Sequence, residues 1–307
     1  MNLTADDFAR LFEVAVDDLP LECRALIDNS DFNYELLTTA SRDEIILDVL
    51  RHIDSEAPTK VGAQRSQLWE RCWSENLQSF VSSEFELEKL VPKFIKPGQP
   101  IRLNQQYVMP RNDLFELCFF QVCRAYFGLK YFSDVKSLYE FGCGTGFNLV
   151  ALGKLMPHLQ LHGLDWSPSA CEMVNLVGKH HDLHMTATRF DFFAPDNKMP
   201  VAPDSAVMTM VALEQTGARH EAFIDSLLAK RPKICLHMEP LLDLYDENNL
   251  IDYLAMRYHQ KRGYLSGLLP RLKELAVSGE IEILETRRMF FGSLYHEGYS
   301  FVVWRPL

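Results

Sequence analysis

The sequence predicts an α/β protein: a doubly wound, seven-stranded, mostly parallel sheet that ends in an antiparallel hairpin and follows an N-terminal helical region. From about residue 137 onward, short apolar runs alternate with helical patterns, which is typical of parallel strands joined by right-handed crossovers. A glycine-rich turn follows the first of these runs. Two strand-like runs follow one another directly at the C-terminal end, which predicts the antiparallel pair.

Composition excludes several classes of protein. The chain has 307 residues, 31 Lys and Arg against 42 Asp and Glu, and a net charge of −11, so we expect no nucleic-acid partner. No apolar run approaches the roughly 18 residues of a membrane span, so we expect no membrane association. Seven cysteines without a CxxC pair fit a reducing compartment, and we expect a cytoplasmic protein.

The chain divides into three predicted parts. Residues 1–60 are predicted to form an N-terminal helical region, and residues 61–135 a helical lid that contributes to a substrate pocket. Residues 136–307 are predicted to form the main α/β domain, in which segment 240–280 is an insertion that shapes the pocket. Whether the chain forms a homo-oligomer is left open.

Two helices are predicted in detail in the N-terminal part. Ser41 to Glu44 has the spacing of a capping box, which predicts that a helix begins there. Trp69 and Trp73 lie one helical turn apart, and we assign them to the core rather than to a pocket.

Seven strands and five helices account for the rest of the chain. The predicted strands are 137–141, 159–164, 185–190, 205–213, 233–238, 281–291 and 299–304. The predicted helices are centred on 149–156, 168–180, 220–230, 249–262 and 266–279.

The glycine-rich turn at the exit of the first strand is the main functional signal. Gly142, Gly144 and Gly146 allow the backbone to turn sharply into a helix and to approach a ligand closely. The dinucleotide-binding fingerprint requires a small residue where this chain has Phe147, and it does not require the acid that this chain has at Glu140.

With Glu140, the three glycines and acids after the second and third strands, residues 137–307 resemble the class I S-adenosylmethionine-dependent methyltransferases. The resemblance implies S-adenosylmethionine as cofactor and S-adenosylhomocysteine as product. The chemistry is compatible, because this nucleoside has no phosphate and no Lys or Arg occurs between residues 137 and 153.

The resemblance also implies roles for individual residues. Glu140 would attract the ammonium of the cofactor, and Asp165 would accept both ribose hydroxyls. Trp166 would flank the adenine, Asp191 would receive its amino group, and Phe192 would stack on the ring or offer its backbone amide.

The stretch after the fourth strand lies where this family places residues that face the sulfonium and the acceptor. It reads ALEQTG, which differs from the motif of methyltransferases that act on nucleobase amines. We expect Glu214, with His237 or His296, to act in catalysis. The residues expected to bind the acceptor are Gln215, Glu239, Tyr245 and Tyr299. The spacing of His220, His237, Glu239 and His296 matches no recognised ligand pattern, so we expect no metal.

The predicted function is methyl transfer to an oxygen or nitrogen of a small-molecule acceptor, with a general base removing the proton. A protein or peptide substrate is the alternative among enzymes. A catalytically silent cofactor-binding protein, with a regulatory or oligomerising N-terminal part, is an alternative of another class. The motifs also permit transfer of a different group from the same cofactor.

Overall fold

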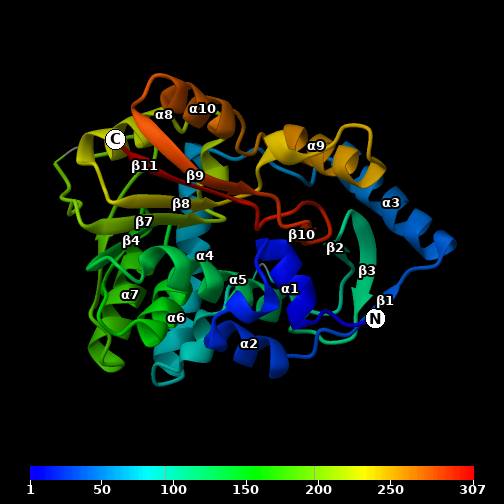
Figure 1. The fold of residues 1–307 in the computed structure, drawn as a ribbon, viewed down its shortest axis with the longest axis horizontal. Coiled ribbons are helices and arrows are strands. Elements are labelled where there is room, and N and C mark those ends of the chain that lie inside the picture. The colour runs from blue at the N-terminus through cyan, green and yellow to red at the C-terminus, as the bar shows by residue number, and fades with distance from the viewer. Residues whose placement is uncertain (94, 197) are drawn as a thin grey trace.

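The computed structural model of the protein describes residues 1–93, 95–196 and 198–307. A seven-stranded sheet with helices on both faces forms one side of the molecule, and a smaller four-stranded sheet lies beside it (Figure 1). The order of the larger sheet is β6-β5-β4-β7-β8-β11-β9. This confirms the predicted fold class.

The larger sheet is parallel except at one edge. Its strands are β4 (Ser137–Phe141), β5 (Gln160–Asp165), β6 (Met185–Arg189), β7 (Ser205–Met210), β8 (Ile234–Met238), β9 (Ile281–Arg287) and β11 (Phe301–Pro306). Strands β4 to β8 pair in parallel, and β11 is antiparallel to both β8 and β9. The chain adds β5 and β6 on one side of β4 and then continues with β7 on the other side. The carboxyl ends of β4 and β7 therefore border a crevice, where doubly wound folds bind ligands.

Two hydrophobic clusters attach the helices to the two faces of this sheet. On one face lie α5 (Phe115–Phe132), α6 (Phe147–Leu155) and α7 (Pro168–His180). On the other lie α8 (Glu221–Lys230) and α10 (Leu268–Val277). Successive residues of a strand point to opposite faces, and β11 shows it: Val303 belongs to the first cluster, and Val302 and Trp304 to the second.

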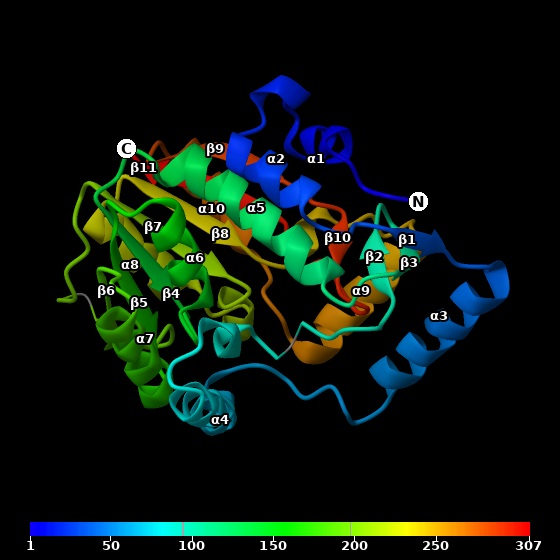
Figure 2. The same cartoon turned by 90° about the horizontal axis from the view of Figure 1, so that it is seen from below.

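The first two helices pack on α5 and share its core. They are α1 (Ala5–Phe12) and α2 (Leu21–Asp28); α2 lies along α5 in Figure 2, and α1 contacts α5 through the rings of Phe8 and Phe12. The ring of Phe12 stacks on Tyr126 at 3.9 Å between centroids, and Phe127 contacts Phe301 of the sheet at 4.0 Å. The start of the chain therefore extends the core of the main domain.

The N-terminal part contains strands that the sequence reading missed. The smaller sheet has the order β1-β3-β2-β10, and its strands are β1 (Tyr34–Leu36), β2 (Ile101–Leu103), β3 (Gln106–Pro110) and β10 (Phe291–Gly292). Asn104 and Gln105 join β2 to β3 with φ angles of 50° and 58°. Two residues of positive φ between paired strands form the tight hairpin turn that asparagine favours. The sequence reading of this part as mostly helical therefore missed three short strands, β1, β2 and β3.

Two predicted boundaries also differ from the structure. Helix α3 (Thr39–Asp54) begins earlier than the predicted capping box, because the Thr38 side chain accepts a hydrogen bond from Ser41 N at 3.2 Å. Strand β9 ends at Arg287, since Phe290 has a φ of 48° and turns the chain toward the smaller sheet.

Two further helices complete the walls of the crevice. Helix α4 (Ser66–Ser82) is held against the start of α7 by Glu70, which accepts hydrogen bonds from Ser167 Oγ at 2.5 Å and Ser169 Oγ at 2.6 Å. Helix α9 (Leu250–Arg262) lies in segment 240–280 and packs against α3. The short 3-10 helices are η1 (Val16–Asp18), η2 (Ala63–Arg65), η3 (Leu87–Leu90), η4 (Leu213–Thr216) and η5 (Leu242–Leu244).

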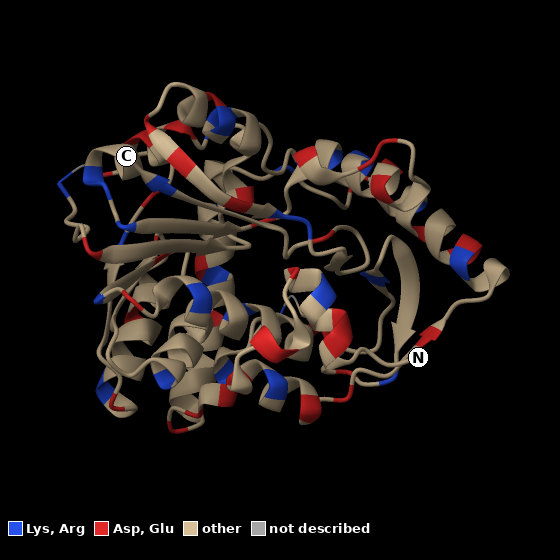
Figure 3. Ribbon diagram, viewed as in Figure 1, with Lys and Arg blue, Asp and Glu red and all other residues tan. Residues whose placement is uncertain are grey.

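Acidic and basic residues are interspersed along the helices in the view of Figure 3. Within the described residues, every helix is too short or too polar to cross a lipid bilayer.

Candidate functional site

The glycine turn after β4 has the left-handed backbone conformation that glycine readily adopts. Gly142, Gly144 and Gly146 all have positive φ angles, of 75°, 50° and 75°. A Cβ atom on Gly142 would lie 2.4 Å from the Cβ of Ala212, so glycine lets this turn approach the segment after β7. The close approach forms the floor of a cavity.

Asp165, the last residue of β5, is tied to this turn. Its carboxylate accepts hydrogen bonds from Gly144 N at 3.0 Å and from Ser167 N at 2.9 Å. Only 5% of the residue is exposed, and burial raises the pKa of its carboxyl to about 6 despite these bonds. The cavity therefore contains a pre-oriented acidic group that remains mostly ionised at neutral pH.

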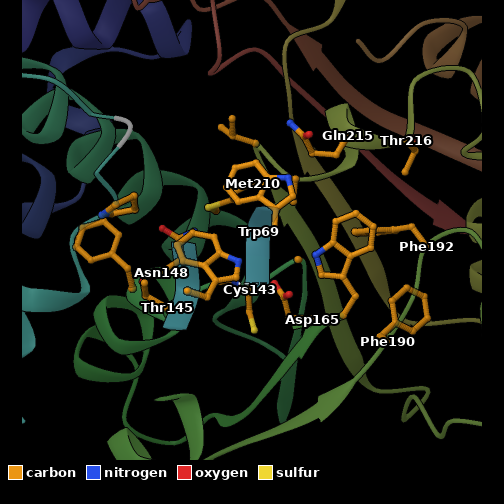
Figure 4. A pocket seen from close by; sticks show the side chains of 18 of the residues that line it. Trp69, Cys143, Thr145, Asn148, Asp165, Phe190, Phe192, Met210, Gln215 and Thr216 are labelled. Carbon is orange, nitrogen blue, oxygen red and sulfur yellow. Dashed lines mark hydrogen bonds between the residues drawn. The ribbon is translucent and has the colours of Figure 1, made fainter. Parts of the chain in front are cut away.

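We call the space at the carboxyl ends of β4, β5 and β7 the first cavity. It is bounded by residues 142–145, Asp165 and the segment after β7, and contains about 800 Å³ free of protein atoms, part of it open to solvent. Its aromatic walls are Trp69, Trp73, Phe147, Trp166, Phe190, Phe192 and Phe193. Trp69, Asp165 and Phe192 surround the same space in Figure 4. Among the described residues, no Lys, Arg or His lines it.

Glu140 lies behind the glycine turn, outside the lining of the first cavity. Its Oε1 accepts a hydrogen bond from Asn148 Nδ2 at 2.7 Å, and Asn148 Oδ1 accepts one from Arg124 Nη1 at 3.0 Å. Burial raises the pKa of Glu140 to about 8, and its Oε2 has no hydrogen-bond partner. Asn148 lines the cavity, so Glu140 is connected to the cavity wall through Asn148.

The structure separates the predicted adenine-binding residues. Trp166 and Phe192 line the first cavity, as their assignment requires. Asp191 is exposed and lines a neighbouring groove that shares Trp166 and Phe190 with the cavity; its Oδ1 accepts a hydrogen bond from Phe193 N at 2.8 Å. Of the three predicted carboxylates, only Asp165 thus lines the first cavity itself.

Sequence reasoning missed two large residues of this cavity. Trp69 and Trp73 were expected in the core, but α4 brings both to the cavity wall, with ring centroids 5.5 Å apart. The ring of Trp73 covers the turn: a Cβ on Gly144 would lie 2.9 Å from its Cζ2. The helical spacing was visible in the sequence, but which face α4 turns toward the sheet was not.

A second cavity adjoins the first across Trp69, Val211 and Gln215, which line both. Its walls come from η2, α5, η4, the end of α9 and the loop before β11. Glu214, Gln215, His296 and Tyr299, predicted to act on the acceptor, are therefore brought together here. Arg65, Lys96, Glu116, Tyr258, Arg262 and Tyr264 also line it.

Glu214 is held in place by a second buried carboxylate. Glu239 accepts hydrogen bonds from the backbone N–H groups of Ala212, Leu213 and Glu214 at 3.0–3.1 Å, which fixes the start of η4. Glu239 thus positions the neighbouring residue and lines neither cavity. Burial, and the charge of Glu239 after it, raise the pKa of Glu214 to about 8.

Val211 lines both cavities and has an unfavourable backbone conformation. Its φ is 53°, rare for a β-branched residue and costly by about 1–3 kcal/mol. This turn ends β7 at Met210, three residues before the predicted end of the strand. It directs the next residues along the cavity walls.

Glu116 of α5 was not predicted as a site residue. It is 6% exposed, accepts a hydrogen bond from Tyr299 Oη at 2.8 Å, and has its other oxygen unpartnered. Burial raises its pKa to about 7. A glutamate in an otherwise apolar helix, FELCFF, is the sequence signal that would have identified it.

His237 and Tyr245, like Glu140, Asp191 and Glu239, line neither cavity. His237 of β8 is fully buried between the rings of Phe223 and Trp304, with its Nδ1 3.0 Å from Thr209 Oγ1. Tyr245 accepts a hydrogen bond from Glu297 N at 2.8 Å and so supports the loop that carries His296. Their positions are explained by packing and by loop support.

Comparisons with known proteins concern the fold. No protein-family model and no curated protein matches the chain. Among solved structures, it is similar to the N-methyltransferase NodS from Bradyrhizobium japonicum WM9 in complex with S-adenosyl-L-homocysteine, with 15% identity, a TM-score of 0.44, and coverage of 64% of this chain and 89% of that one. For human N-acetylserotonin methyltransferase in complex with SAM, the identity is 12%, the TM-score 0.46, and the coverage 99% and 87%.

TnmH is similar at 19% identity and a TM-score of 0.41, over 63% of this chain and 58% of that one, so the match spans less than two thirds of TnmH. The topology of the chain itself is the clearer finding. Its seven-stranded sheet, with β11 antiparallel between β8 and β9 and helices on both faces, has the α/β fold of class I methyltransferases.

Proposed function

We propose that the protein is an S-adenosylmethionine-dependent methyltransferase that acts on an oxygen or nitrogen of a small molecule. One observation supports this most strongly. The first cavity, at the carboxyl ends of β4 and β5, has aromatic walls and one buried aspartate, with no cationic side chain among its described lining residues. Cationic side chains commonly balance the charge of a nucleotide phosphate, and none occurs among these described lining residues, whereas a sulfonium nucleoside has no phosphate.

The residues of the first cavity fit this cofactor. Asp165 would accept the ribose hydroxyls, Trp166 and Phe192 would flank the adenine, and Trp69 would face the sulfonium, since electron-rich aromatic faces attract cations. The Asn148 side chain, which is oriented by Glu140, would serve the amino-acid end. Asp191 reaches the adenine only if the base extends past Phe190 into the neighbouring groove.

When bound, the cofactor supplies an electrophilic methyl group, whose transfer to the acceptor breaks the carbon–sulfur bond, leaves the electron pair on sulfur and releases one proton from the acceptor. Glu214 would take that proton. It follows the segment that lines both cavities, and its free Oε2 has no hydrogen-bond partner. Gln215, which donates to Glu214 Oε1 at 2.7 Å, lines both cavities and would orient the acceptor.

The second cavity supports a small acceptor. Its walls come from segments throughout the chain, from Arg65 to Tyr299, so they surround a ligand on several sides. Segment 240–280 contributes Tyr258, Arg262 and Tyr264 to this cavity.

The test uses cofactor labelled in its methyl group, incubated with the purified protein and a panel of small hydroxyl and amine compounds. We expect label in a small-molecule product together with S-adenosylhomocysteine, both lost in Asp165→Ala. Label found only in added protein or peptide would favour the macromolecular substrate. Cofactor binding without label transfer to either would favour the silent binding protein.

A further inference from the structure

Two arginines of the second cavity pair with aromatic rings rather than with carboxylates: Arg65 lies over Trp69 at 5.4 Å and Arg262 over Tyr264 at 5.0 Å. Arg262 is 8% exposed, and its Nε has no hydrogen-bond partner; its Nη1 makes one long contact, 3.4 Å, with Thr59 Oγ1. Arg65 Nη1 donates to Gln215 Oε1 at 2.8 Å, while its Nε is also unpartnered. Within the part of the chain that the structure describes, neither guanidinium has a carboxylate within 4.0 Å.

The two guanidinium groups act on the same space. Burial lowers the pKa of Arg65, and the positive charge of Arg262 lowers it further. Two cations brought close together in a half-buried wall repel each other and are only partly hydrated, which is unfavourable until an anion lies between them. Two guanidinium groups that line one cavity without a carboxylate partner form a surface suited to an anionic ligand.

The carboxyl groups of the cavity supply only part of the charge that these cations require. Glu116 is bonded to Tyr299, and Glu214 to Gln215. Three cationic side chains, Arg65, Lys96 and Arg262, line the cavity, so an ionised Glu214 leaves it with net positive charge. A carboxylate ligand would lower that charge further.

Flat aromatic side chains form much of the remaining wall. Tyr258 and Tyr295 stack at 4.8 Å between centroids, and Tyr264 packs edge-on against Tyr258 at 5.8 Å. Trp69 closes the side toward the first cavity. Such walls bind planar apolar groups, while the guanidinium plane matches a carboxylate through paired N–H···O bonds.

We propose that the methyl acceptor is a small aromatic carboxylate, bound by Arg65 and Arg262 through its carboxylate and by the tyrosine walls through its ring. This rests on the proposed function in that the ring carries the hydroxyl or amine to be methylated. Arg65 donates to Gln215, which lines both cavities, so carboxylate binding at Arg65 is linked to the side chain beside the reacting atoms.

The test measures binding rather than turnover, so that it does not depend on methyl transfer. Benzoate, benzamide and phenyl phosphate are titrated into the cofactor-free protein and followed by NMR of the tryptophan side chains. We expect benzoate to bind at least ~10-fold more tightly than benzamide, because only benzoate gains the charge-assisted bonds. We expect Arg65→Gln and Arg262→Gln each to lose about 10-fold in benzoate affinity.

Arg305→Gln is the matched control, because Arg305 pairs with Glu282 at the far edge of the sheet. It should leave benzoate binding unchanged. Should the buried Arg262 variant fail to fold, the half-exposed Arg65 variant alone decides. Absence of benzoate binding, equal binding of benzamide, tighter binding of phenyl phosphate, or unchanged affinity in Arg65→Gln would each overturn the proposal. Titration with S-adenosylhomocysteine in parallel reports on the first cavity, so failure of the cofactor assignment is seen separately.

Discussion

The carboxylate of Asp165 accepts a hydrogen bond from the backbone N–H of Gly144 at 3.0 Å, which ties the end of one central strand to the turn that follows its neighbour. Both residues line the first cavity. The contact holds a buried acid in a fixed orientation beside a backbone that approaches closely. Several expectations depend on this pair.

Removing the acid should weaken cofactor binding. Asp165→Ala removes a charged acceptor from the cavity wall, and we expect the affinity for S-adenosylhomocysteine to fall by about 1–3 kcal/mol. Asp191→Ala provides the comparison, because Asp191 lines the neighbouring groove. Fluorescence titration of both variants measures the difference. Equal losses in the two would show that the groove also binds the nucleoside.

Adding a methyl group at Gly144 should lower the stability of the protein by more than the cost of backbone strain alone. In Gly144→Ala, the new Cβ would lie 2.9 Å from Trp73 at a φ of 50°, so both the backbone and the cavity wall must shift. Gly279→Ala is the matched variant, since its φ is 78° and nothing lies within 4 Å of the added atom.

Gly279→Ala should cost only the strain, about 1–2 kcal/mol in the free energy of unfolding. Gly144→Ala should cost more and should also reduce cofactor affinity, as chemical denaturation and ligand titration measure. Similar stabilities with unchanged affinity in both variants would contradict the closeness of the Trp73 contact.

Glu214 should determine how turnover depends on pH. A general base acts in its ionised form, and its pKa is raised to about 8, so turnover should rise with pH up to that value. Glu214→Gln should lower turnover by about 10²–10⁴-fold and abolish this rise. Glu116→Gln is the comparison, because Glu116 is a buried acid of the same cavity whose pKa is about 7. If Glu116→Gln, rather than Glu214→Gln, loses turnover and its rise with pH, Glu116 is the base.

Stability should fall as the pH rises above neutrality. The pKa of Glu140 is raised from 4.5 to about 8 by burial, so between these values the folded state retains a proton that the unfolded state loses. This contribution to stability is full at low pH and is lost as the pH rises to 8. The buried His237 makes stability rise with pH, because its pKa is lowered from 6.5 to about 3. Above about pH 6.5 the histidine is neutral in both the folded and the unfolded state, so it no longer changes the stability.

Above that pH the carboxyl groups dominate, each contributing up to about 1.4 kcal/mol per pH unit. The free energy of unfolding from urea titrations should therefore decrease between about pH 6.5 and 8. Glu140→Gln keeps an acceptor for Asn148 and removes the titration, so its decrease should be smaller. An identical slope in the two proteins would show that Glu140 is already ionised.

The sequence predicts the larger sheet well because its signals are local. Helix α7 begins at Pro168 and ends at His180, as predicted, because Ser167 caps its first turn and the apolar face repeats every three to four residues. The order in which glycines and acids follow the strands assigns Gly144 and Asp165 to the same site, and in the structure a hydrogen bond joins them. These features need only the alternation of strands and helices.

The smaller sheet and the second cavity could not be predicted in this way. Strand β10 is two residues long and pairs with β2, nearly two hundred residues earlier in the chain. Arg65 and Glu116 lie in different helical segments and share a cavity only once the helices are packed. Tertiary packing also decides that Trp69 faces a cavity and His237 does not. Residue type indicates chemistry, but the face turned toward a ligand depends on partners distant in the sequence.

The central claim is that an aromatic cavity with one buried aspartate, and with no Lys, Arg or His in its described lining, binds a sulfonium nucleoside. Isothermal titration calorimetry of the unmodified protein with S-adenosylmethionine, and separately with NADH, tests it most directly. We predict saturable binding of one S-adenosylmethionine per chain and no binding of NADH. Binding of NADH, or no binding of S-adenosylmethionine, would contradict the claim.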